Sequence, residues 1–206
     1  MQIKWLGHAS FKLKGTKTVY IDPWKISPDE KADIILITHP HFDHFSPEDI
    51  GKIQKPETII VGPKDSIKGI EGNIKELEPG QSLELSDIKI QTFVSYNKNK
   101  EFHPRKNNWL SFLIRMDGTS VFHTGDADDI KDFHSIKTDV LLIPVSGTYV
   151  MNYKEASSLA NIMKPKLCIP MHWGDIVGSE DDAKKFKKVS KSQVEILKPG
   201  ETLNFP

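Results

Sequence analysis

The chain has 206 residues, of which 37% are hydrophobic and 27% are charged, a composition typical of a globular protein that buries a core. Its 28 basic and 28 acidic residues cancel, which argues against a protein that holds nucleic acid mainly through phosphates. The single cysteine, Cys168, excludes an internal disulfide, and the lack of a signal peptide or of a ~20-residue apolar stretch leads us to expect a cytoplasmic protein with no membrane span.

Short apolar runs bounded by turn residues predict buried strands along the whole chain. The predicted strands cover residues 18–21, 33–38, 58–61, 88–94, 110–115, 120–123, 139–145 and 166–170. The segment 97–109 is the longest stretch without a core pattern, and we therefore predict a loop there.

Three helices are predicted. Ser46 is placed as an N-cap, followed by a proline and two acidic residues in the first turn. Asn152 and Glu155 open a second helix in the same way, and a third is expected over 181–189 with a largely solvated surface. The apolar face of the second helix follows helical spacing and consists of Ala156, Leu159, Ala160 and Met163.

The chain also repeats itself at about half its length. Residues 15–22 resemble 118–126, and residues 33–37 resemble 139–143, in the same order and with similar offsets. This repeat indicates two βαβ-like halves, although chance similarity between strands is the alternative. Two such sheets packed face to face, with helices outside, form a four-layer αββα sandwich. We therefore expect a mixed α/β (α+β) fold with two pseudo-repeated halves in one domain over 1–206.

A run of potential metal ligands, His39-Pro-His41-Phe-Asp43-His44, follows the predicted strand 33–38 directly. Residues two apart in an extended chain face the same side, so His39 and His41 can bind one ion. Asp43 and His44 lie where the backbone turns, and they can face a second point nearby. Two ions ~3.5–4 Å apart can share a water and lower its pKa towards neutrality. Four such residues in six positions therefore predict a metal site.

This H-x-H-x-D-H order resembles the metallo-β-lactamase superfamily, and the resemblance spans nearly the whole chain. The family's bridging aspartate is matched by Asp126, and its final histidine is matched by His172. The segments 5–10 and 20–23 resemble the branch that includes L-ascorbate-6-phosphate lactonase-like proteins. The resemblance implies a metallo-β-lactamase-like fold and a metal-dependent hydrolase. Its motifs are specific for the fold but not for the substrate.

The resemblance also implies two metal sites, of which one is complete and the other is not. The predicted ligands are His39, His41, Asp43, His44, Asp126 and His172. The family normally supplies a third histidine after a middle strand, but the strand 88–94 leads into a segment with no histidine at that point. Three alternatives stay open: His103 reaches the site, Asn97 coordinates weakly, or Asp126 completes the site with water. One or two ions per chain are therefore expected.

Asp43, His8 and His103 are the predicted catalytic residues. Asp43 is expected to orient the attacking water or carry its proton. By the resemblance His8 faces the active site, with a structural hydrogen bond as the alternative. Asp22 is expected to hold a ligand imidazole in one tautomer, unless it only caps a turn. The basic cluster around His103 is either a lid that attracts an anionic substrate or an exposed polar loop. The cluster comprises Lys98, Lys100, His103, Arg105 and Lys106.

The sequence thus predicts a metal-dependent hydrolase that uses a metal-activated water on an ester, lactone, amide or phosphoester of a small anionic molecule. Imidazole with carboxylate suits Zn²⁺ first, with Mn²⁺ or Fe²⁺ as alternatives. A nuclease of the same fold and a non-catalytic metal-binding protein are the rival hypotheses. A diiron redox enzyme is disfavoured, because that relative carries glutamate where this chain has His41. Neither a nucleic-acid partner nor a particular oligomeric state is expected from the sequence.

Overall fold

The computed structural model describes residues 1–28 and 30–206, and within them two seven-stranded sheets are formed. The first sheet has the order β14-β1-β2-β3-β4-β5-β6 and consists of β14 (Thr202–Asn204), β1 (Gln2–Gly7), β2 (Ser10–Lys14), β3 (Thr18–Ile21), β4 (Ile34–Leu36), β5 (Ile59–Gly62) and β6 (Asn73–Glu76). The second has the order β13-β12-β11-β10-β9-β8-β7 and consists of β13 (Gln193–Val194), β12 (Leu167–Met171), β11 (Val140–Pro144), β10 (Thr119–His123), β9 (Leu110–Met116), β8 (Ile88–Val94) and β7 (Ser82–Leu85).

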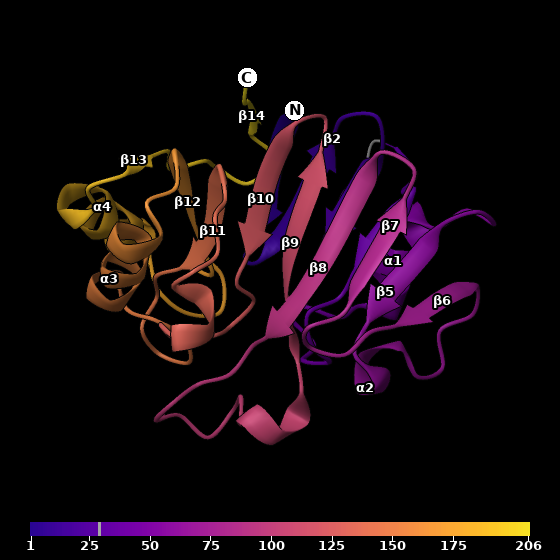
Figure 1. Cartoon of the computed structure of the whole chain (residues 1–206), viewed down its shortest axis with the longest axis horizontal. Coiled ribbons are helices and arrows are strands. Elements are labelled where there is room, and N and C mark those ends of the chain that lie inside the picture. Colours follow the sequence, from indigo (N-terminus) through magenta and orange to yellow (C-terminus); the bar gives the residue numbers. More distant parts are fainter. Residues whose placement is uncertain (29) are drawn as a thin grey trace.

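Helices cover the outer sides of the two sheets. They are α1 (Pro47–Ile53), α2 (Lys64–Ile67), α3 (Tyr153–Met163) and α4 (Glu180–Val189), with short 3₁₀ turns at Arg105–Asn107 and Lys131–Phe133. In Figure 1, α3 and α4 lie beside β11 and β12 on one side of the molecule, while α1 and α2 lie beside β5 and β6 on the other. This arrangement confirms the predicted αββα sandwich.

The uninterrupted apolar sequence of β4 is explained by burial on both faces of the strand. Ile34 and Leu36 belong to the core between the two sheets, whereas Ile35 and Ile37 belong to the smaller core under α1 and α2. A strand that is buried on both faces reads as a continuous hydrophobic run, as expected for a parallel strand covered by helices. The same double burial places the end of β4, and the histidine motif that follows it, deep in the molecule.

The two halves repeat in topology as well as in sequence. In each half, three antiparallel strands lead into three parallel pairings: β1 to β6 correspond to β8 to β13. An extra edge strand follows the same rule, because β14 pairs with β1 as β7 pairs with β8. The pseudo-repeat predicted from the sequence is therefore a repeat of the whole pairing pattern.

Equivalent aspartates at the start of the repeated strands make equivalent contacts. Asp33 accepts hydrogen bonds from the backbone N–H of Thr18 at 2.8 Å and from Lys55 Nζ at 2.7 Å. Asp139 accepts them from the backbone N–H of Ser120 at 2.9 Å and from Lys166 Nζ at 2.8 Å. Each carboxylate thus ties two neighbouring strands together, which gives aspartate the same structural role at both positions of the repeat.

Replacing Asp139 by asparagine removes the charge that pairs with Lys166 and is expected to lower the free energy of unfolding at pH 7. The loss should be only roughly 1 kcal/mol, because solvent screens this partly exposed pair. Burial raises the pKa of Asp139, but the hydrogen bonds from Lys166 and Ser120 outweigh it and bring the pKa down from 3.8 to about 2. A carboxylate whose pKa is lower in the folded chain than in the unfolded chain stabilises the fold at pH values above its unfolded pKa. This contribution to stability is lost as the pH falls towards 2. Denaturant unfolding at pH 7 and pH 2.5 measures the effect.

The control for this change is Glu76→Gln, which removes one charge from an exposed position of β6. We expect it to leave the free energy of unfolding within about 0.5 kcal/mol at both pH values. Equal destabilisation by Asp139→Asn at pH 7 and pH 2.5 would show that the carboxylate charge does not matter.

The helix termini follow the sequence signals closely. Ser46 Oγ accepts from the backbone N–H of Asp49, and Asn152 forms a reciprocal capping box with Glu155. The four predicted apolar residues of α3 are all buried. Among the described residues, every helix is too short or too polar to cross a membrane.

Several strands were not predicted, and their sequences explain why. β1 and β2 form an N-terminal hairpin whose apolar residues alternate with lysines, and β6 and β7 are mostly exposed edge strands. Edge strands lack the continuous apolar run that identifies a buried strand. The very short β13 and β14 were missed for the same reason. The predicted loop over 97–109 contains only the 3₁₀ turn at Arg105–Asn107.

Candidate metal centre

Loops from both halves meet at one end of the two sheets. The histidine motif follows β4, Asp126 follows β10, and His172 follows β12. Because these strands run parallel within their sheets, their carboxyl ends share one edge. The β1–β2 turn adds His8, and the loop after β8 adds His103. All the predicted site residues are therefore brought together.

One cluster consists of three imidazoles. The potential ligand atoms of His39, His41 and His103 all lie within 4.8 Å of one another. His103 Nε2 is 3.3 Å from His39 Nε2, and two ligands of one tetrahedral zinc ion lie about 3.3 Å apart. Trp109 packs against this cluster, with its ring centroid 5.0 Å from that of His39. Of the three open alternatives for the third position, the structure brings the imidazole of His103 there.

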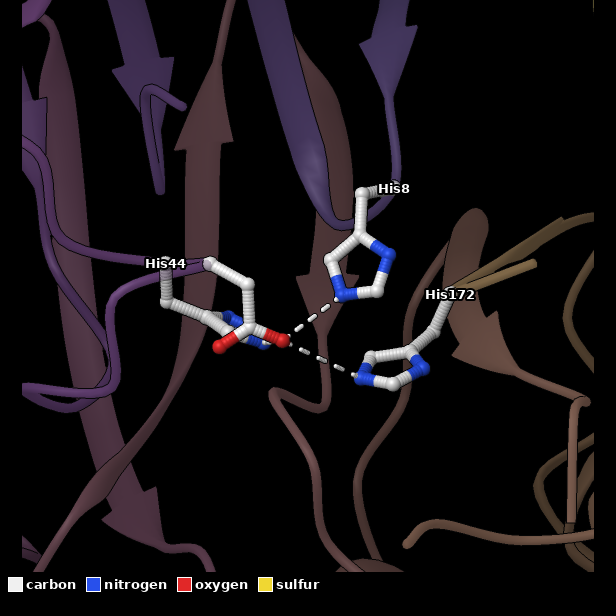
Figure 2. A group of neighbouring side chains, drawn as sticks. His8, His44 and His172 are labelled. Atoms are coloured by element: carbon white, nitrogen blue, oxygen red, sulfur yellow. Dashed lines mark hydrogen bonds and ion pairs between the residues drawn. The ribbon is translucent and has the colours of Figure 1, made fainter. Parts of the chain in front are cut away.

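The second cluster consists of His8, Asp43, His44 and His172, whose potential ligand atoms also lie within 4.8 Å of one another. Figure 2 shows the rings of His8, His44 and His172 converging from three different segments of the chain. Asp43 Oδ2 is 3.9 Å from His44 Nε2 and 4.0 Å from His172 Nε2. Its much shorter contact, 3.0 Å, is with His8 Nε2.

The carboxylate of Asp126 lies between the two clusters. Its Oδ1 is 3.2 Å from His44 Nε2, and its Oδ2 is 3.1 Å from His172 Nε2. The same Oδ2 is 3.4 Å from His103 Nε2. One carboxylate therefore reaches donors of both groups, as a bridging ligand of two ions has to do.

Two buried atoms test whether a metal ion fits here. His44 Nε2 and Asp126 Oδ1 are inaccessible to solvent and lie 3.2 Å apart, yet neither atom makes a hydrogen bond of good geometry. Leaving a buried polar atom without a hydrogen bond costs about 1–3 kcal/mol, so these two atoms need an explanation. An ion between an imidazole nitrogen and a carboxylate oxygen would satisfy both atoms. The imidazole and carboxylate donors thus fit a divalent transition ion.

Hydrogen bonds outside the clusters fix the imidazole tautomers. His44 Nδ1 donates to Asp22 Oδ2 at 2.7 Å, and His39 Nδ1 donates to Thr38 Oγ1 at 2.9 Å, which in turn donates to Asp22. His103 Nδ1 donates to the side-chain oxygen of Asn97 at 2.9 Å. Each ring thereby keeps the lone pair of Nε2 for the centre, which is how outer-shell groups orient metal ligands. Asp22 has the orienting contact predicted for it.

These contacts also decide the position of Asn97. Its amide oxygen is occupied by His103, and its Nδ2 donates to the backbone carbonyl of Asp126 at 2.7 Å. Asn97 therefore orients His103 and does not point an oxygen at the centre. Thr38 and Trp109 were not predicted from the sequence, because a threonine at a strand end and a tryptophan in a loop carry no ligand signal of their own.

The electrostatics divide the histidines into two kinds. Burial lowers the pKa of His39 well below its usual value and that of His103 to about 4, so both are neutral at pH 7. Burial also opposes a charge on His44, but the carboxylates of Asp126 and Asp22 outweigh it and raise its pKa well above the usual value. A metal ion at His44 Nε2 therefore has to displace a proton, which makes metal binding pH-dependent.

Strained backbone occurs at several of these positions. His8, Asp22 and His172 have left-handed φ angles of 49°, 46° and 60°. Such conformations cost of order 1 kcal/mol or more outside glycine, and they concentrate at functional sites. Gly125, with φ of 58°, precedes Asp126, and a Cβ there would lie 3.2 Å from the backbone oxygen of Leu110. A side chain there would have to adopt a left-handed φ and also displace the Leu110 backbone by a few tenths of an ångström, so glycine suits the turn that presents Asp126.

The model of a family described as a beta-lactamase superfamily domain matches residues 2–172. The chain belongs to the beta-lactamase superfamily. It is 33% identical to a UPF0173 metal-dependent hydrolase of Archaeoglobus fulgidus, over 100% of this chain and 99% of that protein. It is 30% identical to a UPF0173 metal-dependent hydrolase of Pyrococcus abyssi, over the full length of both. These relatives confirm the prediction of a metal-dependent hydrolase.

Solved structures described as metal-dependent or metallo hydrolases share the fold. A candidate metal-dependent hydrolase from Parabacteroides distasonis superposes with a TM-score of 0.85 and 30% identity, over 94% of this chain and 91% of that one. Igni18, a metallo hydrolase from Ignicoccus hospitalis, superposes with a TM-score of 0.80 over 100% and 99% of the two chains, at 20% identity. The second likeness is one of fold alone.

The lysines and arginine of the loop after β8 do not line the cavity at the centre. Lys100 forms an ion pair with Asp128, and Arg105 lies 3.6 Å from Asp132 and over the ring of Tyr96. Within the described chain, the cavity at the centre has a volume of 370 Å³ and is lined by His41, Phe42, Asp43, Phe102, His103, Asp126, Tyr149, His172 and Ile176. Of the predicted basic lid, only His103 lines this cavity.

Proposed function

We propose that this chain hydrolyses an ester or lactone bond in a small molecule at a centre of two divalent ions. The observation that carries the proposal is the position of Asp126, whose two oxygens lie 3.1–3.4 Å from donors of both clusters. The residues proposed for the first ion are His39, His41 and His103. Those proposed for the second are Asp43, His44 and His172, with Asp126 shared by both.

Zinc is the proposed metal, with Mn²⁺ or Fe²⁺ as alternatives, because the donors are imidazoles and carboxylates. When bound, such ions supply a Lewis acid that lowers the pKa of a water molecule and polarises the oxygen of the scissile bond. Cys168 adds no thiolate, since it is buried in β12 and burial raises its pKa to about 12. The choice among these metals therefore depends on geometry and supply.

Asp43 is proposed to orient the attacking water. Burial raises its pKa, but contacts with His8 and His44 lower it to about 2, so it stays an anion at neutral pH. An ionised carboxylate accepts hydrogen bonds from water, and at such a low pKa it is a poor store for a proton. His8 is proposed as a positioning residue, because its Nε2–H holds Asp43 Oδ2 at 3.0 Å. His103 is assigned here to the metal, which replaces its expected role as a catalytic lid residue.

The cavity favours a small molecule over nucleic acid. Its 370 Å³ lie within the range of ~300–1,000 Å³ that is usual for small-molecule sites. No lysine or arginine of the described chain lines it, whereas a nuclease needs cations along the path of the phosphates. The same feature weakens the expectation of an anionic substrate.

Metal removal tests the proposal directly. Protein treated with chelator is expected to lose at least ~100-fold in turnover of carboxylic esters and lactones, because the chain alone has no activated nucleophile. Titration with Zn²⁺, Mn²⁺ or Fe²⁺ should restore activity and saturate near two equivalents. A panel of lactones, carboxylic esters, thioesters and phosphodiesters, with single-stranded RNA and DNA as further substrates, identifies the bond that is cleaved.

The rival functions predict different results in the same assays. A nuclease would cleave RNA or DNA faster than any ester, and a phosphodiesterase would prefer the small phosphodiesters. A non-catalytic metal-binding protein would take up two equivalents of metal and turn over none of the substrates. Each of these outcomes would refute the proposed ester or lactone hydrolase.

A further inference from the structure

The mouth of the cavity carries an unusual concentration of exposed apolar side chains. In the described residues, five large hydrophobic side chains are exposed, and three of them line this cavity: Phe42 at 69%, Phe102 at 55% and Ile176 at 38%. Scattered exposed hydrophobics are normal, but a group at one cavity indicates a binding surface. Tyr149 completes the group, which we call the apolar rim: Phe42, Phe102, Tyr149 and Ile176.

Four separate loops build the apolar rim. Phe42 lies between two predicted ligands, Phe102 precedes His103, Tyr149 follows β11, and Ile176 follows β12. The rings of Phe102 and Tyr149 meet edge to face with centroids 4.8 Å apart, and Phe42 meets Trp24 at 6.0 Å. The rim is therefore a surface of aromatic edges and aliphatic carbon that lines the same cavity as the proposed metal donors. Its side chains come from the same loops as several of those donors.

Three basic side chains near the rim are paired with acidic ones. Lys25 binds Asp175 at 3.0 Å, Lys100 binds Asp128, and Arg105 contacts Asp132. A charged substrate tail that packed against the phenyl rings of the rim would lose its hydration without a cation among the described residues that line the cavity, which is costly. An uncharged hydrocarbon group instead gains by removing the rim from water.

We infer that the substrate carries an uncharged apolar group, an acyl chain or an aromatic ring, which packs on the apolar rim while the scissile bond lies at the metal centre. This inference rests on the proposed ester or lactone hydrolysis and adds the class of substrate. The reaction adds the oxygen of water to the acyl carbon and breaks the acyl–oxygen bond. The alcohol leaves with a proton from the water.

A series of 4-nitrophenyl esters tests the inference in the zinc-loaded full chain. From acetate through butyrate to hexanoate, kcat/KM is expected to rise about twofold per methylene, half of the roughly fourfold that complete burial gives. Hexanoate should therefore exceed acetate by roughly 10- to 20-fold. The mono-4-nitrophenyl ester of glutarate has a similar length but ends in a carboxylate, and its kcat/KM should be at least about 10-fold below that of hexanoate.

Two variants, Phe102→Ser and Ile176→Ser, each remove one apolar side chain of the rim and leave every proposed ligand in place. Each is expected to reduce the hexanoate-to-acetate ratio to about 3 or less, and the ratio cancels any loss of metal common to both substrates. The matched control is Val189→Ser, which removes an equally exposed apolar side chain at the end of α4 and should leave the ratio unchanged.

A binding assay provides a readout that does not depend on turnover. The neutral dye N-phenyl-1-naphthylamine should bind the wild-type chain with increased fluorescence, and its Kd should rise at least fivefold in Phe102→Ser and Ile176→Ser but not in Val189→Ser. If no ester is hydrolysed and the dye still shows this pattern, the proposed function fails and the apolar rim stands as a binding site.

The opposite combination would overturn the inference alone. Equal kcat/KM for acetate and hexanoate, or a preference for the glutarate ester, would leave an ester hydrolase whose substrate does not use the rim. Binding of the chain to neutral phosphatidylcholine vesicles, with no dependence on ester length, would assign the rim to a membrane surface and would equally refute a substrate-binding role.

Discussion

Replacing Asp126 by alanine is expected to reduce activity by roughly 10³-fold or more and to lower metal content from about two ions per chain to below one. The carboxylate lies 3.1 Å from His172 Nε2 and 3.2 Å from His44 Nε2, and it is almost completely buried. Its removal takes a donor from both clusters at once and leaves His44 without one of the two anions beside it. Elemental analysis and turnover of the preferred ester measure both effects.

Two further variants make this experiment specific. Asp126→Asn keeps the shape of the side chain, so it should retain the fold, as judged by thermal unfolding, yet lose metal nearly as strongly. His134→Ala is the matched histidine control, because that ring is partly exposed and bonds Asp129 at 2.7 Å, away from both clusters. Equal loss of metal and activity in His134→Ala and Asp126→Ala would remove the basis for a bridging role of Asp126.

Replacing His103 by alanine is expected to lower metal content from about two ions per chain to about one. His103 Nε2 is 3.3 Å from His39 Nε2, and without it the first cluster keeps only two imidazoles. The first site would then keep His39, His41 and the shared carboxylate of Asp126, one imidazole fewer than in the intact centre, and we expect its affinity to fall at least about 100-fold. Equilibrium dialysis against a graded series of metal buffers measures the two affinities separately.

The neighbouring residues supply a graded comparison. Asn97→Ala removes only the acceptor that holds His103 Nδ1, and it should weaken the same site about 10- to 100-fold. Lys106→Ala changes an exposed residue of the same loop and should change neither affinity. If His103→Ala retained two tightly held ions and only raised KM, the ring would contact substrate and some other group would complete the first site.

The sequence alone identified the layers and the repeat, because their signals are local. A strand such as β4, buried on both faces, needs an unbroken apolar run, and that run is visible in the sequence. The capping residues of α1 and α3 are likewise local, since Ser46 and Asn152 bond backbone groups two or three residues away. Exposed strands such as β6 and β7 carry no such signal and became visible only through their pairing.

The candidate metal ligands likewise fall into those that the local sequence indicates and one that only the tertiary structure places. His39, His41, Asp43 and His44 lie within six residues, so their spacing indicated a metal site before any fold was known. The third imidazole of the first cluster, by contrast, comes from 64 residues away and reaches His39 only because the loop after β8 folds back over the centre. A loop of 13 residues without a periodic pattern has many possible paths, and the sequence therefore left three alternatives open.

The sequence by itself thus determined the superfamily, the sandwich and most of the candidate metal donors. Tertiary structure decided which histidine joins the first cluster, which groups hold the tautomers, and which side chains surround the cavity. The physical reason is that a donor's chemistry is carried by its residue type, whereas its partner depends on contacts between distant segments. His8 meets Asp43 across 35 residues, and Asp126 meets His172 across 46. Only the packing of the two sheets brings those segments together, and with them the apolar rim.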